Sequence, residues 1–160
     1  MLKRFENMLL GLAALAVLAM GAMITLNVVL RLFGTSLPDS VVLVRELMVA
    51  GILLPLAAVT AARAHVCVEV LTNRLPDRVT QFLILIGWFI GLIAFAPMVF
   101  AGWRELSATW SSGSFFFGDL SLPKWPGRLI FFVAMVAFWL RLLLVFKTDA
   151  QAFLRGEKAE

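Results

Sequence analysis

Four long apolar runs with almost no charged side chains dominate the 160-residue sequence. The first run covers residues 7–30 and the third covers 79–103, and neither contains a charged residue. A helix needs about 20 apolar residues to cross the roughly 30 Å hydrocarbon core of a bilayer, so both runs are long enough. The second run, 47–62, and the fourth, 129–146, are shorter but continue into flanking helical sequence. The pattern predicts four membrane-crossing helices.

The composition favours a membrane protein over a soluble domain. Hydrophobic residues make up 62% of the chain and charged residues 15%, with a mean hydropathy of +0.97. A soluble domain is about half apolar and about a quarter charged. We therefore predict an all-α integral membrane protein, a single domain over 1–160, with its helices in up-down-up-down order. The four expected transmembrane helices cover about residues 7–31, 38–64, 78–105 and 126–147.

Local features refine this scheme. Pro55 lies near the middle of the second expected helix, where proline removes a backbone hydrogen bond, so a kink is expected there. Residues 63–78 intersperse charged residues with valine and leucine, which is typical of a short amphipathic segment in the membrane interface. The run 7–30 follows Lys3 and Arg4 as in a signal peptide, but signal peptides have apolar runs of only about 7–15 residues. We interpret the run as a membrane helix.

Basic residues are divided unequally between the two sides that four crossings define. Nine lie on the side of both termini and the interfacial segment: Lys3, Arg4, Arg63, Arg74, Arg78, Arg141, Lys147, Arg155 and Lys158. Five lie on the other side: Arg31, Arg45, Arg104, Lys124 and Arg128. Because basic residues favour the cytoplasmic side, both termini and the interfacial segment are expected in the cytoplasm.

The sequence offers few residues for catalysis or for binding a metal or cofactor. His65 and Cys67 are the sole histidine and cysteine, which excludes paired haem histidines, a multi-histidine metal site and an internal disulfide. The serines of 107–114 are expected across the membrane from His65, so a serine–histidine pair cannot form. The net charge of +4 comes from basic residues at the ends of apolar runs, as membrane proteins place them. We predict no enzyme activity, no metal, no cofactor and no nucleic-acid partner.

Two adjacent charge pairs, Arg45-Glu46 and Arg104-Glu105, are expected near the non-cytoplasmic ends of the second and third helices. Neighbours on a helix point about 100° apart, so neither pair neutralises itself. If these helices pack antiparallel, Arg45 meets Glu105 and Glu46 meets Arg104 in a four-charge cluster. The alternative is that all four side chains extend to lipid headgroups, as Arg141 is expected to do on the cytoplasmic side.

Two further patterns predict helix contacts and interfacial anchoring. Gly87 and Gly91 lie four residues apart on one face of the third helix, and such a small-residue face lets another helix approach closely. An aromatic belt is expected at the non-cytoplasmic headgroups. Its members are Trp103, Trp110, Phe115, Phe116, Phe117 and Trp125.

Several segments occur in an order that matches a known family. The most specific are His65 with Val68-Glu69 and Leu75-Pro76 after it, and Pro123 with Trp125 before the last helix. The end of the first helix, 27–34, and an acid near the start of the second, Glu46, add to the match. Over nearly its whole length the chain resembles the small, DctQ-like membrane subunit of tripartite ATP-independent periplasmic (TRAP) transporters. Residues 61–64 and 131–134 differ from the usual sequence of the family. These differences concern which subfamily, and therefore which substrate, the resemblance implies.

The resemblance implies a scaffold role in a bacterial inner membrane. Such a subunit pairs with a large membrane subunit that moves an organic acid anion with sodium, and a periplasmic binding protein delivers that anion. Lys124, Arg128 and the aromatic loop are the candidates for docking the binding protein. The structural or partner-contact candidates are Arg45, Glu46, His65, Glu69, Gly87, Gly91, Arg104, Glu105, Pro123 and Trp125.

Two other functions stay open from the sequence. The first is an accessory or assembly subunit of a different membrane complex. The second is a small lipid-modifying membrane enzyme, for which the candidate polar sets are the four-charge cluster and His65 with Glu69.

Overall fold

The computed structural model describes residues 2–61 and 76–155, and this part of the chain is helical apart from its connecting loops. The helices are α1 Leu2–Leu32, α2 Ser40–Leu53, α3 Leu56–Ala61, α5 Asp77–Ser112 and α6 Trp125–Arg155. In this part of the chain, four spans are long and apolar enough to cross a membrane: Glu6–Leu32, Ser40–Thr60, Arg78–Ser112 and Trp125–Arg155. The predicted all-α fold with four membrane-crossing helices is confirmed.

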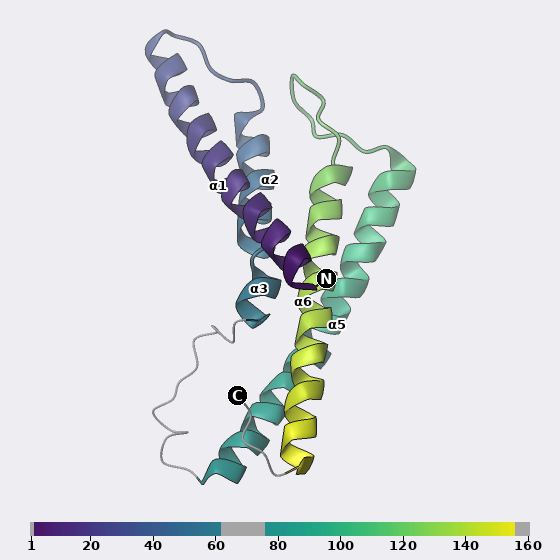
Figure 1. Ribbon diagram of the computed structural model, residues 1–160. Coiled ribbons are helices and arrows are strands. Elements are labelled where there is room, and N and C mark those ends of the chain that lie inside the picture. Colours follow the sequence, from purple (N-terminus) through teal and green to yellow (C-terminus); the bar gives the residue numbers. More distant parts are fainter. Residues whose placement is uncertain (1, 62–75, 156–160) are drawn as a thin grey trace.

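The helices form two hairpins that meet along α6 (Figure 1). In the first hairpin α1 packs on α2, and in the second α5 packs on α6. α6 also contacts α2 and α3, whereas α5 packs extensively only on α6. The loops 33–39 and 113–124 lie at the same end of the molecule, which we call the loop end.

Gly34 ends the first helix through its backbone conformation. Its φ of 74° is left-handed, which glycine adopts without steric cost. The Gly34 amide donates to the Arg31 carbonyl and the Thr35 amide donates to the Leu30 carbonyl, both at 3.1 Å. These two bonds satisfy carbonyls that the end of a helix otherwise leaves unpaired.

The second helix begins two residues later than expected, at Ser40 rather than near 38. Asp39 precedes it with a left-handed φ of 54°, a conformation that aspartate tolerates better than most residues. The side chain of Asn27 holds this turn against α1. Its amide nitrogen lies 3.3 Å from the Ser40 hydroxyl, and its amide oxygen accepts from the Leu37 amide at 3.1 Å.

Pro55 interrupts the second span, as the sequence predicts. α2 ends at Leu53 and α3 starts at Leu56, with Leu54 and Pro55 between them. Proline lacks the amide hydrogen that would continue the helix, and its ring crowds the preceding turn. Below the break, the Val59 amide bonds to the Pro55 carbonyl at 2.9 Å, so the helix resumes at once.

The last two spans are longer than the sequence indicated. α5 continues to Ser112 and stops at Gly113, whose φ is 59°. α6 continues to Arg155, beyond the end expected near residue 147. At 36 and 31 residues they measure about 54 Å and 46 Å, well beyond the hydrocarbon thickness. Tertiary contacts explain the extension of α6, because Asp149 and Phe153 both pack against α5.

Small side chains form the core where α1, α2 and α6 meet. The buried cluster consists of Leu9, Ala13, Ala16, Ala50, Leu54 and Ala134. The helices approach so closely that a Cβ on Gly51 would lie 3.0 Å from Val17. Alanine and glycine permit such contacts inside a membrane, where packing rather than water exclusion holds helices together.

Candidate functional site

The loop between α5 and α6 is an ordered hairpin at the loop end. The Phe116 amide donates to the Leu122 carbonyl at 2.8 Å, and the Lys124 amide donates to the Ser114 carbonyl at 3.0 Å. Phe115 and Pro123 form an isolated bridge between its two sides. Pro123 therefore lies at the base of the hairpin, where its missing amide hydrogen costs no bond.

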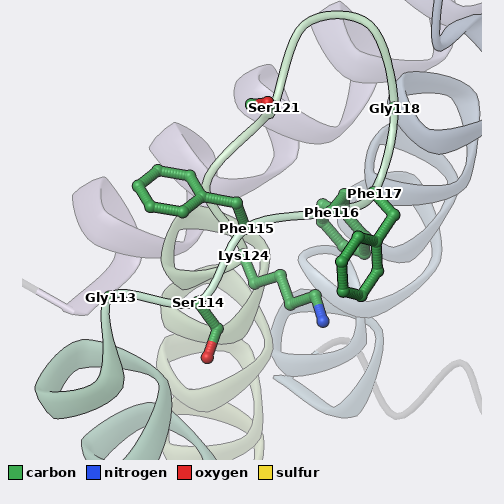
Figure 2. Close-up of a pocket in the computed structure, with 8 residues that line it drawn as sticks. All are labelled: Gly113, Ser114, Phe115, Phe116, Phe117, Gly118, Ser121 and Lys124. Atoms are coloured by element: carbon green, nitrogen blue, oxygen red, sulfur yellow. The ribbon is translucent and has the colours of Figure 1, made fainter.

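Aromatic side chains project from this hairpin (Figure 2). Phe117 is fully exposed, and more than half of Phe115 is exposed. The ammonium group of Lys124 lies 5.4 Å from the centre of the Phe116 ring, within the range of a cation–π contact. Together with Ser114 and Ser121, these residues line an open cavity of about 490 Å³. The hairpin offers an open, aromatic surface with a single basic group.

Tryptophans flank the hairpin where it joins the two helices. Trp110 in α5 and Trp125 at the start of α6 pack edge to face with ring centres 5.2 Å apart. Trp103, two turns before Trp110 in α5, packs on Phe132 in α6 with ring centres 5.5 Å apart. Trp110 and Trp125 lie near the ends of their helices, whereas Trp103 and Phe132 lie about two turns or more inside them.

Asp39 joins the two connecting loops. Its carboxylate accepts a hydrogen bond from the Leu120 amide at 2.7 Å, across 81 residues of sequence. Gly118 lies against the same carboxylate, with no room for a side chain. The short distance fits a charge-assisted bond. The α1–α2 turn thereby fixes the position of the aromatic hairpin.

The described residues do not form the four-charge cluster, which was one of the two arrangements considered for these helix ends. The Glu105 carboxylate lies 3.6 Å from Arg128 in α6 rather than near Arg45. Glu46 packs against Gly127 in the first turn of α6. Arg45 is exposed, and no described side chain forms an ion pair with it or with Arg104. The second and third spans do not pack extensively on each other in the described chain, and both pack on α6 instead.

Glu46 places a negative charge beside the amino-terminal end of a long helix. The first turn of α6 leaves backbone amides without helical partners, and the helix dipole gives this end a partial positive charge. A Cβ on Gly127 would collide with the Glu46 carboxylate. Gly127 therefore provides the space in which Glu46 compensates that end of α6.

Arg141 points into the protein rather than toward the headgroups, which corrects the expectation from the sequence. Its Nε lies 3.4 Å from a carboxylate oxygen of Glu6, with side-chain exposures of 22% and 8%. Arg141 is thirteen residues beyond Arg128, about 20 Å along the helix. A charge at that depth is costly unless it is paired, and Glu6 from α1 supplies the pair.

Polar contacts also join α5 to α6. The Trp88 indole donates to the Asp149 carboxylate at 3.0 Å, and the Trp139 indole donates to the Leu92 carbonyl at 3.1 Å. Gly91 faces α6, since a Cβ there would lie 3.3 Å from Leu142. Gly87 instead has open space around it. Among the described residues, Gly91 makes a close contact with another helix and Gly87 does not.

The face of α5 opposite α6 is apolar and has no partner in the described chain. Helical spacing puts five exposed residues on this stripe, which we call the free stripe of α5. They are Ile86, Ile90, Ile93, Pro97 and Phe100. None of the most apolar segment of α5 is buried, in contrast to the other three spans.

Two of the predicted partner-contact residues lie outside the described residues, and two residues with structural contacts were not predicted from the sequence. His65 and Glu69 fall in the segment that the structure does not describe, so their surroundings stay open. Within the described ranges, no group of three or more His, Cys, Asp or Glu side chains is placed to hold a metal ion. Sequence reasoning did not single out Asp39 or Asp149. A signal existed for Asp149, which continues the buried spacing of Leu142 and Val145.

Comparison with known protein families gives one match. The model of the family described as tripartite ATP-independent periplasmic transporters, DctQ component, matches residues 20–152. This range includes the second part of α1, the loops 33–39 and 113–124, and nearly all of α6. No curated protein matches the chain.

Proposed function

Since the chain belongs to the DctQ family of tripartite ATP-independent periplasmic transporters, we propose that it is the fixed membrane scaffold for a large permease subunit. The family is a transporter component and not an enzyme, which confirms the prediction of no enzymatic role. We propose further that the large subunit imports an organic acid anion with sodium. A periplasmic binding protein delivers this anion. These finer assignments come from the sequence resemblance.

The free stripe of α5 is the observation that best supports a scaffold role. Within the described chain, α5 touches little besides α6, so its opposite face is available along the length of the membrane. Isoleucine, proline and phenylalanine give this face a ridged surface that another helix can pack against. We assign the free stripe to the large subunit. The exposed apolar surface of α1, which includes Leu15 and Leu18, is proposed to face lipid.

The loop end suits contact with the binding protein. Its hairpin is ordered by its own backbone bonds and fixed by Asp39, so a docking partner loses little entropy in ordering it. Exposed Phe115 and Phe117 supply the aromatic anchors that are common at protein interfaces. With both termini in the cytoplasm, this end faces the periplasm of an inner-membrane protein.

Co-purification tests the scaffold assignment. The tagged chain is expressed with the large membrane subunit of its transporter and purified in mild detergent. We expect the two to be recovered together, and Ile93→Ala/Phe100→Ala to lower that recovery about tenfold through lost packing. Leu15→Ala/Leu18→Ala, at exposed positions of α1, is the matched control and should recover the partner fully.

Recovery of the chain alone from every preparation would contradict the proposal, provided that the large subunit is present in the same membranes. Helical content and unfolding temperature of each variant show whether the fold is intact. Because both pairs of substitutions are on exposed faces, neither should change the fold.

A further inference from the structure

We propose that a cavity between α5 and α6 at the loop end binds the headgroup of a phospholipid, with a preference for phosphoethanolamine. The cavity measures about 260 Å³ and is lined by Ala101, Gly102, Arg104, Glu105, Arg128 and Phe131. This site lies one helical turn beyond the free stripe of α5, toward the loop end, and it shares no lining residue with the cavity of the aromatic hairpin. It requires only that the chain spans a membrane, not that it serves in a transporter.

Two guanidinium groups line the cavity, an exposed one from Arg104 and one from Arg128 that forms a long ion pair with Glu105. No hydrogen bond or ion pair in the described part of the chain engages the Arg104 guanidinium, which is exposed. The Arg128 Nε lies 3.6 Å from Glu105, beyond hydrogen-bond distance, and has no other partner among the described residues. Arginine recognises phosphate through paired, charge-assisted hydrogen bonds. The phosphate of a lipid would therefore lie between Arg104 and Arg128.

Glu105 adds a selectivity that two arginines alone would lack. Its side chain is 58% exposed and only weakly engaged by Arg128. A carboxylate beside a phosphate site repels a purely anionic ligand but attracts an ammonium group. A headgroup with one phosphate and one primary amine matches this set of charges. A quaternary amine has the same charge but cannot donate hydrogen bonds to the carboxylate.

The depth of the cavity fits a headgroup rather than a solute. Arg104 directly follows the uncharged run 79–103, and Arg128 directly precedes the apolar start of the last span. Basic residues at such positions meet the phosphates of one leaflet. The close approach of Gly102 to Phe131 forms an apolar floor, because a Cβ on Gly102 would lie 3.1 Å from that ring. The volume falls below the roughly 300 Å³ of the smallest typical small-molecule pockets.

Native mass spectrometry of the purified full chain in detergent tests this site. The probes are phosphatidylethanolamine, phosphatidylcholine and phosphatidylglycerol with identical acyl chains. We expect phosphatidylethanolamine to bind most tightly. Arg104→Gln should weaken binding of both zwitterionic lipids about tenfold, because it removes a charge-assisted contact to the phosphate. Arg104 is exposed, so its replacement should leave the fold intact.

One further variant tests the role of Glu105, and a second variant serves as the control for the position of the site. Glu105→Gln should reduce phosphatidylethanolamine binding to the level of phosphatidylcholine and strengthen phosphatidylglycerol binding. Arg31→Gln is the matched control, since Arg31 lines a different loop-end cavity that has no acidic residue. Its lipid binding should equal that of the unmodified protein.

Three results would overturn the proposal. Equal binding of all lipids by the unmodified protein and Arg104→Gln would exclude a headgroup site. Preference for phosphatidylglycerol, with no effect of Glu105→Gln on phosphatidylethanolamine, would indicate a simple anion site. Loss of the large subunit on Arg104→Gln, with unchanged lipid binding, would assign the cavity to a protein contact.

Discussion

At the scale of single residues, the contact between Glu6 and Arg141 combines two charges that a membrane accepts only as a pair. Removing one partner leaves the other buried and uncompensated. We predict that Glu6→Gln or Arg141→Gln lowers the free energy of unfolding by about 3 kcal/mol. Thermal unfolding of the purified protein in detergent measures the change. Arg4→Gln, on the same end of α1 but exposed, should have little effect.

The paired replacement Glu6→Leu/Arg141→Met separates pairing from packing. It removes both charges and fills the space with apolar side chains, so stability should return to within about 1 kcal/mol of the unmodified protein. If the two single changes and the double change are instead additive, the residues do not interact and the assignment of this pair is wrong.

The contact between Glu46 and Gly127 gives a second prediction at this scale. Gly127→Ala would push the Glu46 carboxylate away from the first turn of α6, and we expect it to cost about 0.5–1 kcal/mol of stability through the lost interaction with the helix dipole. Glu46→Gln keeps the shape but removes the charge, and should cost about 0.5–1 kcal/mol. Chemical denaturation in mixed micelles measures both. A neutral Gly127→Ala variant would show that Glu46 has another position open to it.

At the scale of helices and loops, apolar run length and proline chemistry predicted most of what is seen. The four spans and the break at Pro55 follow from residues within each segment. The continuation of α6 to Arg155 does not, because it depends on contacts of Asp149 with Trp88 and of Phe153 with Phe82. Local helix propensity predicts the end of a helix poorly when tertiary contacts determine where that helix ends.

The candidate site was harder to predict for the same reason. The charge pairs of α2 and α5 were recognised, but their partners were not, because nothing in the sequence places α6 between those helices. Glu105 pairs with Arg128, and Arg141 with Glu6, across long stretches of chain. The spacing of residues in the sequence indicates on which face of its own helix a residue lies. It does not indicate which helix covers that face.

The two loops of the loop end should behave as one unit. Asp39→Ala removes the acceptor of the Leu120 amide, so hydrogen exchange at Leu120 should accelerate at least about tenfold. Asp39→Asn keeps an acceptor and tolerates the left-handed backbone, and should have a smaller effect. Hydrogen–deuterium exchange with peptide mapping over 113–124 detects the difference. Equal exchange in Asp39→Ala and the control Asp119→Ala would mean that Asp39 does not hold the hairpin.

At the scale of the whole molecule, the proposed topology gives a direct labelling prediction. In a Cys67→Ala background, Asp119→Cys at the tip of the aromatic hairpin should react with a membrane-impermeant maleimide added to intact spheroplasts. Arg155→Cys at the end of α6 should react only after the membrane is permeabilised. The reverse pattern would invert the orientation and would place the aromatic hairpin in the cytoplasm, away from any periplasmic binding protein.

The scaffold role itself is tested most directly by photo-crosslinking in native membranes that contain the complete transporter. A photoreactive phenylalanine analogue is placed at Ile93 on the free stripe of α5 or at Leu18 on α1, both exposed in the isolated chain. We predict a covalent adduct with the large membrane subunit from position 93 and none from position 18. An adduct from position 18 alone, or from neither position, would contradict the account.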